Sequence, residues 1–266
     1  MQIENRVSLN IENQVAQVQL NRPEKHNALD LEMFRAIVEV QKAVARNRGI
    51  RAVVLSGSGV DFCSGLDVKA VMKDRAGMVR LLWKWLPWRA NLAQQVSVGW
   101  RTLSVPVIAA IQGRCWGGGL QIALGADFRY VTPTASLSIM EGKWGLIPDM
   151  GGTLALREVL PLDHALMLAM TADRINGERA VELGLATTVT EDPAGMALES
   201  ASEFLERSPD AVAAVKRLYQ KSWAKGAGLA LARESAYQVR ILSGSNQKIA
   251  VGRQFGGDTE FQPRRW

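Results

Sequence analysis

Apolar and polar residues alternate along the first twenty positions of the chain. The alternation in Val7–Ile11 and again in Val15–Leu20 predicts two strands that form an antiparallel hairpin. Over Leu31–Ala45 the apolar residues recur at helical spacing, and Asp30 stands where an N-cap is expected. The chain therefore opens with a hairpin followed by an amphipathic helix.

Short, continuously apolar runs follow this helix. Arg51–Gly57 and Val105–Gln112 have the length and composition of buried strands, and Phe128–Thr132 and Ala135–Ile139 resemble further short strands. A helical pattern over Leu120–Gly125 lies between the second and third of these runs. Strands that alternate with helices are typical of an α/β core.

After about Gly151 the pattern becomes helical. One further strand is expected near Thr187–Thr190. The predicted helices cover Leu154–Leu160, His164–Thr171, Gly177–Leu183, Ala194–Glu206, Ala211–Ala224 and Ala227–Leu242. We therefore expect an α/β core joined to a helical C-terminal region.

The segment Met72–Leu103 fits neither pattern. It combines basic residues with Trp83, Trp85, Trp88 and Trp100. A tryptophan cluster is typical of a core, a pocket wall or an oligomer interface. An amphipathic segment that lies on a membrane surface is the alternative.

The net charge of +6 points to an anionic partner, for which nucleic acid, a membrane surface and a phosphorylated small molecule are the candidates. No basic block occurs in the sequence, so we expect no nucleic acid as a partner.

Cys63 and Cys115 have no CxxC spacing, which predicts buried thiols in a reducing compartment. The polar N-terminus predicts no signal or transit peptide, and no apolar run reaches the length of a membrane span, so we expect a cytoplasmic protein.

Several chemistries are excluded by missing motifs. The sequence has no GxSxG, HExxH or GxxxxGK[ST] motif, and the glycines at 117 and 119 are followed by Ile122 where a dinucleotide fingerprint needs a small residue. His26 and His164 lie far apart in the sequence, so we expect no metal site.

Backbone N–H groups and carboxylates remain as candidate chemistry. Two glycine-rich turns follow predicted strands, at Phe62–Asp67 (FCSGLD) and at Gly113–Gly119 (GRCWGGG). Each can present N–H groups at a helix N-terminus, as an oxyanion hole requires, although such turns also serve purely structural purposes.

Two acids, Glu141 and Asp149, stand among apolar and glycine residues in the stretch MEGKWGLIPDMGGT. If the turn at Pro148–Gly152 folds back, both carboxyls face one apolar cavity, where the pKa of a carboxyl rises and proton exchange near neutral pH becomes feasible. Oxyanion stabilisation combined with carboxylates suits the movement of a proton beside a thioester carbonyl. The alternative for each acid is a capping or surface ion-pair role.

Five segments in order resemble the crotonase (enoyl-CoA hydratase/isomerase) superfamily, and the resemblance runs from about Val7 to Thr190. The segments are residues 20–29 (LNRPEKHNAL), 61–69 (DFCSGLDVK), 111–119 (IQGRCWGGG), 126–129 (ADFR) and 140–153 (MEGKWGLIPDMGGT). The resemblance implies an α/β fold, namely a crotonase-like spiral of ββα turns with a C-terminal helical region. Residues 1–200 would form the spiral core with an acyl-CoA site, and residues 201–266 a helical region for oligomerisation and covering.

The resemblance also implies an acyl-CoA thioester as substrate, no cofactor beyond its CoA moiety, and a homotrimer or a dimer of trimers. By position, the backbone N–H groups of Leu66 and Gly118 would bind the thioester oxygen. The phosphates of CoA would meet Lys69 and Arg22. The full set of residues expected to hold CoA is Arg22, Lys25, His26, Ala28, Ser64, Gly65, Asp67 and Lys69.

The acids distinguish members of the family. Hydratases carry one glutamate two residues after the GGG and another at the position of Glu141, whereas this chain has Gln121 at the first position. Dienoyl-CoA isomerases are similar in having acids at the positions of Glu141 and Asp149, although they carry an aspartate at the position of Gln121. Ring isomerases of phenylacetate breakdown have a similar GLIPD turn.

We therefore expect an acyl-CoA double-bond isomerase in which Glu141 and Asp149 carry protons. An enoyl-CoA hydratase in which Gln121 orients water is the first alternative. A non-catalytic relative that binds CoA esters or RNA is the second.

Overall fold

A seven-stranded sheet organises the computed structural model, which describes residues 2–3 and 5–266. Its strand order is β1-β2-β3-β4-β5-β7-β10; the first three strands pair antiparallel, and the pairs from β3 to β10 are parallel. The strands are β1 (Gln2–Ile3), β2 (Val7–Glu12), β3 (Val15–Leu20), β4 (Ala52–Gly57), β5 (Val107–Ile111), β7 (Phe128–Val131) and β10 (Thr188–Val189).

Helices cover both faces of this sheet. In β4, Val53 and Leu55 pack on the side of α1 (Leu31–Arg46) and α4 (Leu92–Thr102). The alternating residues Ala52 and Val54 pack on the opposite side, with α9 (Pro193–Leu205). Successive side chains of a strand point to opposite faces, so a strand buried on both faces is apolar throughout. This burial explains why β4 and β5 lack the alternation seen in the hairpin.

A second, smaller layer lies beyond the ends of the parallel strands. It contains a three-stranded sheet in the order β6-β8-β9. Its strands are β6 (Arg114–Trp116), β8 (Ser136–Ser138) and β9 (Ile175–Asn176). The short helices associated with it are α5 (Gly118–Ala123), α6 (Gly152–Val159), α7 (Leu162–Thr171), α8 (Gly177–Glu182) and the 3-10 helix η2 (Met140–Trp144). A second 3-10 helix, η1 (Pro23–Lys25), lies on the loop after β3.

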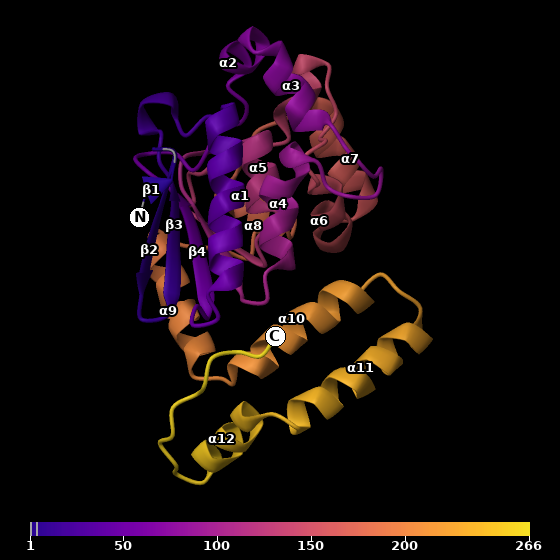
Figure 1. Ribbon diagram of the computed structural model, residues 1–266. Coiled ribbons are helices and arrows are strands. Elements are labelled where there is room, and N and C mark those ends of the chain that lie inside the picture. Colours follow the sequence, from indigo (N-terminus) through magenta and orange to yellow (C-terminus); the bar gives the residue numbers. More distant parts are fainter. Residues whose placement is uncertain (1, 4) are drawn as a thin grey trace.

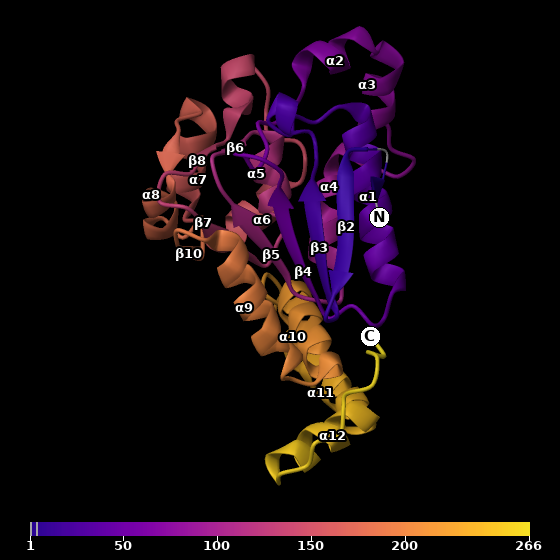
Figure 2. The ribbon, with the colours of Figure 1, turned by 90° about the vertical axis from the view of Figure 1, so that its left-hand side faces the viewer.

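The last three helices extend away from the sheet and its covering helices (Figure 1 and Figure 2). They are α10 (Pro209–Ser222), α11 (Ala227–Leu242) and α12 (Ser245–Gln254), and α11 has no buried residue among those that the structure describes. We refer to them as the C-terminal arm. The chain then returns to the core, where Arg264 is buried and donates hydrogen bonds to carbonyl groups at the end of α1.

Most of the predicted elements are present. The hairpin pairs Val7 with Leu20, and the Asp30 carboxylate accepts a hydrogen bond from the N–H of Met33, which confirms the predicted N-cap. Four α-helices were not predicted, namely α2 (Val68–Lys73), α3 (Arg75–Leu82), α4 and α12, and neither were the two 3-10 helices. Both cysteines are buried and unpaired, as expected.

The tryptophan-rich segment therefore contains α3, α4 and the loop that joins them. Trp100 lies in the core, whereas Trp83, Trp85 and Trp88 are more than half exposed. No helix in the described part of the chain combines the length and the apolar character needed to cross a bilayer.

We predict that Arg264→Ala lowers the free energy of unfolding by about 2–3 kcal/mol, because the buried guanidinium donates to the carbonyls of Val44, Asn47 and Ile50. Chemical denaturation followed by circular dichroism measures the effect. Arg265→Ala is the matched control, since that side chain is exposed and its residue bonds Asp210 through the backbone N–H. Equal effects of the two substitutions would contradict the prediction.

Candidate active site

The loops that follow β3, β4 and β5 meet at the carboxyl ends of these parallel strands, where α2, α3 and α5 also lie (Figure 2). Backbone hydrogen bonds join the loops: the N–H of Leu29 donates to Gly65, and the N–H of Asp67 donates to Leu29. The backbones of Cys63 and Cys115 form a similar isolated β-bridge, which joins the loop after β4 to the loop after β5. Side chains and N–H groups from three distant segments are thereby brought together, as is usual at the carboxyl edge of a parallel sheet.

The backbone N–H groups of Leu66 and Gly118 are the candidates for an oxyanion site in this region. Within the described residues, neither the N–H of Leu66 nor that of Gly118 donates a hydrogen bond. Leu66 directly precedes Asp67, the N-cap of α2, and Gly118 is the first residue of α5 and is buried. A buried N–H without a partner is costly, so its retention is consistent with a site for an anionic or polarised oxygen.

Close contact between the turns requires glycine at position 65. Gly65 has a φ of +90°, and a Cβ built there would lie 2.8 Å from the carbonyl oxygen of Trp116 and 3.6 Å from the backbone nitrogen of Gly118. Any larger residue would push the two turns apart. The two free N–H groups therefore belong to one small region of the structure.

Glu141 lies beside these turns. It belongs to η2, and a Cβ on Gly117 would be 3.5 Å from its Oε1 atom. Its Oε2 atom is buried and has no hydrogen-bond partner within the described residues. Burial raises the pKa of Glu141, and the nearby charge of Asp149 raises it further, against the hydrogen bonds from its own N–H and from Gln121, which lower it. A carboxylate with one free oxygen and a raised pKa is suited to accept a proton.

Gln121 holds the other oxygen of Glu141. Its Nε2 donates to Glu141 Oε1 over 2.5 Å, while its own Oε1 accepts from the N–H groups of Met150 at 2.9 Å and Gly152 at 3.2 Å. Gln121 is itself buried. Its amide is therefore oriented by the main chain, and one of its hydrogens is committed to Glu141.

Asp149 has a different environment from the one that the sequence predicts. The expectation that it is buried among apolar residues is wrong, since its side chain is exposed in this chain. Its apolar neighbours Leu146 and Ile147 are themselves more than half exposed and cannot enclose it. The turn does fold back, because Met150 and Gly152 bond Gln121, and Asp149 is close enough to raise the pKa of Glu141.

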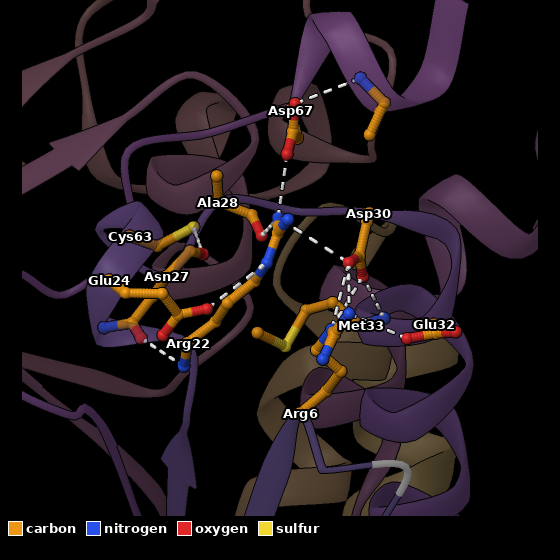
Figure 3. Close-up of polar contacts among 11 residues, drawn as sticks. Arg6, Arg22, Glu24, Asn27, Ala28, Asp30, Glu32, Met33, Cys63 and Asp67 are labelled. Carbon is orange, nitrogen blue, oxygen red and sulfur yellow. Dashed lines mark hydrogen bonds and ion pairs between the residues drawn. The ribbon is translucent and has the colours of Figure 1, made fainter. Parts of the chain in front are cut away.

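Arg22 is enclosed by protein groups (Figure 3). Its Nη1 atom donates to Asp67 Oδ2 at 2.9 Å and to the carbonyl of Ala28 at 3.1 Å, and it lies 3.6 Å from Asp30 Oδ2. The side chain is 12% exposed. Its charge is therefore already paired inside the protein, which conflicts with the expectation that it meets a phosphate of CoA.

The other residues expected to hold CoA lie on the two paired loops or, in the case of Lys69, at the start of α2. Lys25, His26 and Lys69 are exposed. The Nδ1 atom of His26 is 2.7 Å from Asp61 Oδ2, which gives this histidine a partner within the protein. Ala28 is buried and Ser64 is half-buried, with the Ser64 N–H donating to the carbonyl of His26.

Asn27 was not recognised from the sequence. It is buried with a φ of +54°, its Oδ1 accepts from the N–H of Arg22, and its Nδ2 donates to the carbonyls of Ser58 and Asp61. Asparagine tolerates this backbone conformation better than most residues. The sequence feature that could have indicated Asn27 was its position next to His26 in a polar loop.

Among the described residues, no three His, Cys, Asp or Glu side chains are grouped in a way that suits a metal ion. The groups in this region are two backbone N–H donors, the half-buried carboxylate of Glu141 and the exposed carboxylate of Asp149. Such a set can stabilise an oxyanion and transfer protons.

Comparison with known proteins defines the class. The sequence model of the "Enoyl-CoA hydratase/isomerase" family matches residues 10–255. The chain therefore belongs to this family, within the crotonase superfamily, and is an enzyme of that family. The predictions of the superfamily and of the α/β fold class are confirmed.

The names of different relatives give different activities. Enoyl-CoA hydratase EchA19 of Mycobacterium tuberculosis is 34% identical over 202 residues, covering 75% of this chain and 74% of the relative. The mitochondrial Delta(3,5)-Delta(2,4)-dienoyl-CoA isomerase of Mus musculus is 32% identical over 213 residues, covering 74% of this chain and 63% of that protein. An enoyl-CoA hydratase structure from Mycobacterium tuberculosis H37Rv superposes with a TM-score of 0.86 at 26% identity, covering 97% and 99% of the two chains.

We predict that Glu141→Gln changes the pH dependence of stability. With a raised folded-state pKa, the folded chain retains a proton that the unfolded chain loses above its ordinary value of 4.5. In wild type this carboxyl therefore lowers the free energy of unfolding as the pH rises through the folded pKa. Denaturation at several pH values should show the variant gaining stability relative to wild type as the pH rises. A difference that does not change with pH would contradict the pKa direction.

Proposed function

We propose that this enzyme moves a double bond within an acyl-CoA thioester, as an enoyl- or dienoyl-CoA isomerase. The observation that carries the proposal is the amide at position 121. Gln121 cannot titrate, and its amide is bonded to Glu141 and to two backbone N–H groups. This bonding leaves Glu141 Oε2 as the free basic atom beside the paired turns.

In the proposed reaction, Glu141 Oε2 removes a proton from a carbon that is conjugated with the thioester. The electron pair of the broken C–H bond moves into the conjugated system and places negative charge on the thioester oxygen. The N–H groups of Leu66 and Gly118 stabilise that oxygen, an interaction typically worth a hundredfold or more in rate for each donor. Asp149, which must enter this step in its protonated form, then gives its proton to the distal carbon and becomes a carboxylate. Glu141 is left protonated, and transfer of that proton to Asp149 through water restores both starting states. The product has the same mass as the substrate.

An enoyl-CoA hydratase is the second candidate, and the names of relatives that are called hydratases favour it. Addition of water needs a proton for one carbon and a hydroxide equivalent for the other. Gln121 can orient water but cannot exchange a proton with it, so Glu141 would carry both transfers with help from Asp149. The committed hydrogen bonds of Gln121 support the isomerase over this route.

The activity is tested with a medium-chain 3,5-dienoyl-CoA, followed by ultraviolet absorbance and mass together. We expect a shift in conjugation at unchanged mass. Glu141→Gln and Asp149→Asn should each lower kcat by about a hundredfold or more, since each removes a proton-transfer group. A product heavier by one water would favour the hydratase, and wild-type isomerisation by both variants would overturn the assignment of the acids.

Gln121→Glu tests the choice between the two reactions. The new carboxylate would stand within hydrogen-bond distance of Glu141, so the two groups would share a proton and the pair would titrate with a raised pKa. We expect the variant to gain hydration of a 2-enoyl-CoA from a near-zero wild-type rate. A wild-type hydration rate comparable with isomerisation would instead support a native hydratase.

We further propose that the enzyme needs no cofactor beyond the CoA moiety of its substrate, and that it assembles as a homotrimer or a dimer of trimers. Exposed apolar residues on the C-terminal arm, among them Leu229, Leu231 and Val239, support assembly because they are unusual on an isolated surface. The free thiols of Cys63 and Cys115 support a reducing, cytoplasmic location.

A further inference from the structure

Arg22 joins the two loops that carry the candidate site. One atom, Nη1, contacts the carbonyl of Ala28 on the loop after β3 and the carboxylate of Asp67 on the loop after β4. These contacts flank the backbone pair of Leu29 with Leu66. Each contacted residue is the immediate neighbour of one member of that pair. Figure 3 shows the Arg22 guanidinium between Ala28 and Asp67, so Arg22 links the two loops next to the pair.

The Leu66 peptide is held on both sides by the same pairing. The carbonyl of Gly65 accepts from the N–H of Leu29 at 2.8 Å, and the N–H of Asp67 donates to the carbonyl of Leu29 at 3.0 Å. The N–H of Leu66 therefore points away from Leu29, toward the side where it has no partner within the described chain. Its direction depends on how firmly Asp67 is fixed.

Asp67 has two oxygens with different partners. Oδ1 accepts from the N–H of Ala70 at 3.1 Å and caps α2, while Oδ2 binds Arg22 at 2.9 Å. Burial alone would raise the pKa of Asp67, but the hydrogen bonds from Ala70 and Arg22 and the charges of Arg22 and Lys25 lower it overall. The carboxylate is therefore held ionised and in one orientation at the start of the helix.

Other contacts fix Arg22 in turn. Its backbone N–H donates to Asn27 Oδ1 at 2.8 Å, and its guanidinium lies near Asp30, the N-cap of α1. Arg6 binds the same Asp30 through Nε at 2.9 Å and does not contact Asp67. Of the two arginines that lie near Asp30, Arg22 therefore contacts the loop that carries Leu66 and Arg6 does not.

We propose that Arg22 is a positioning residue that aims the Leu66 N–H at the substrate oxygen by holding Asp67 and Ala28 together. This inference rests on the proposed role of the Leu66 and Gly118 N–H groups, but not on the choice between isomerase and hydratase. It departs from the expectation that Arg22 binds a CoA phosphate.

Four variants test this role. Arg22→Met removes the charge and the hydrogen bonds, Arg22→Lys keeps the charge without the planar fork, and Asp67→Asn keeps an oxygen for the α2 cap but weakens the ion pair. Arg6→Met is the matched control, since it breaks an ion pair in the same cluster and leaves the contact between Arg22 and Asp67 intact. Circular dichroism verifies that each variant is folded.

The first readout is the ultraviolet band of the enolate of bound acetoacetyl-CoA, titrated against pH. Donors aimed at the thioester oxygen favour the enolate, so we expect the ratio of bound enolate to bound keto form at a fixed pH to fall about tenfold in Arg22→Met and Asp67→Asn, less in Arg22→Lys, and not in Arg6→Met. A displaced donor typically costs on the order of a hundredfold in rate when it moves by about 1 Å. We expect kcat to fall between tenfold and a hundredfold, with a smaller change in KM.

The second readout separates positioning from phosphate binding. The same variants are assayed with an acyl-CoA and with the matching acyl-pantetheine, which lacks the nucleotide and its phosphates. We expect the same fold loss with both substrates. A rise in KM for the acyl-CoA alone, with kcat unchanged, would overturn the inference in favour of a phosphate ligand.

The failure of this inference is distinguishable from the failure of the proposed function. An enolate band in wild type that is unchanged in Arg22→Lys and Asp67→Asn would overturn the positioning role alone. Absence of the band and of turnover in wild type would overturn the oxyanion assignment and the positioning role together. If Arg22→Met does not fold, the lysine and asparagine variants decide the outcome.

Discussion

The backbone pairing of Leu29 with Leu66 is the constraint on which the candidate site depends. It joins the loop after β3 to the loop after β4, more than thirty residues later in the sequence. The contact of Gly65 with Trp116 then places the loop after β5 against the first two. Because these loops all leave the carboxyl ends of parallel strands, the sheet sets their separation and the pairing sets their orientation. The two unpartnered N–H groups follow from this arrangement and need no side chain of their own.

The side chains around the N–H pair divide into groups that are fully bonded and groups that are not. Gln121 is bonded through both the oxygen and the nitrogen of its amide, whereas Glu141, within the described part of the chain, is bonded through Oε1 and not through Oε2. A buried oxygen without a partner lowers stability, and native proteins retain such groups mainly where function requires them. The same burial raises the pKa of Glu141, so the cost to the fold and the basicity of the carboxylate have one cause.

Local patterns in the sequence predict the elements well and the site unevenly. The hairpin, the first helix and its Asp30 cap follow from alternation, helical spacing and cap chemistry, all of which act over a few residues. The helix α4 was missed although Asn91 and Gln94 form a capping box at its start, because its buried face includes Ser97 and Gly99, which interrupt the apolar pattern. The exposure of Asp149 could not be predicted, since burial depends on what packs over a turn and its apolar neighbours are themselves exposed.

The net charge shows the same limit, because a formal count does not distinguish exposed from internal cations. Arg22 is paired with Asp67, Lys216 with Asp127, and the buried Arg264 and Arg129 donate to backbone carbonyls. These four cations interact with groups inside the fold and therefore contribute little to the electrostatic attraction of a ligand. Lys25 in η1 and Lys69 at the start of α2, by contrast, are exposed and lie next to the loops that carry the site. An argument from charge to an anionic partner therefore has to rest on exposed cations beside the site, such as these two lysines, and not on the total of +6.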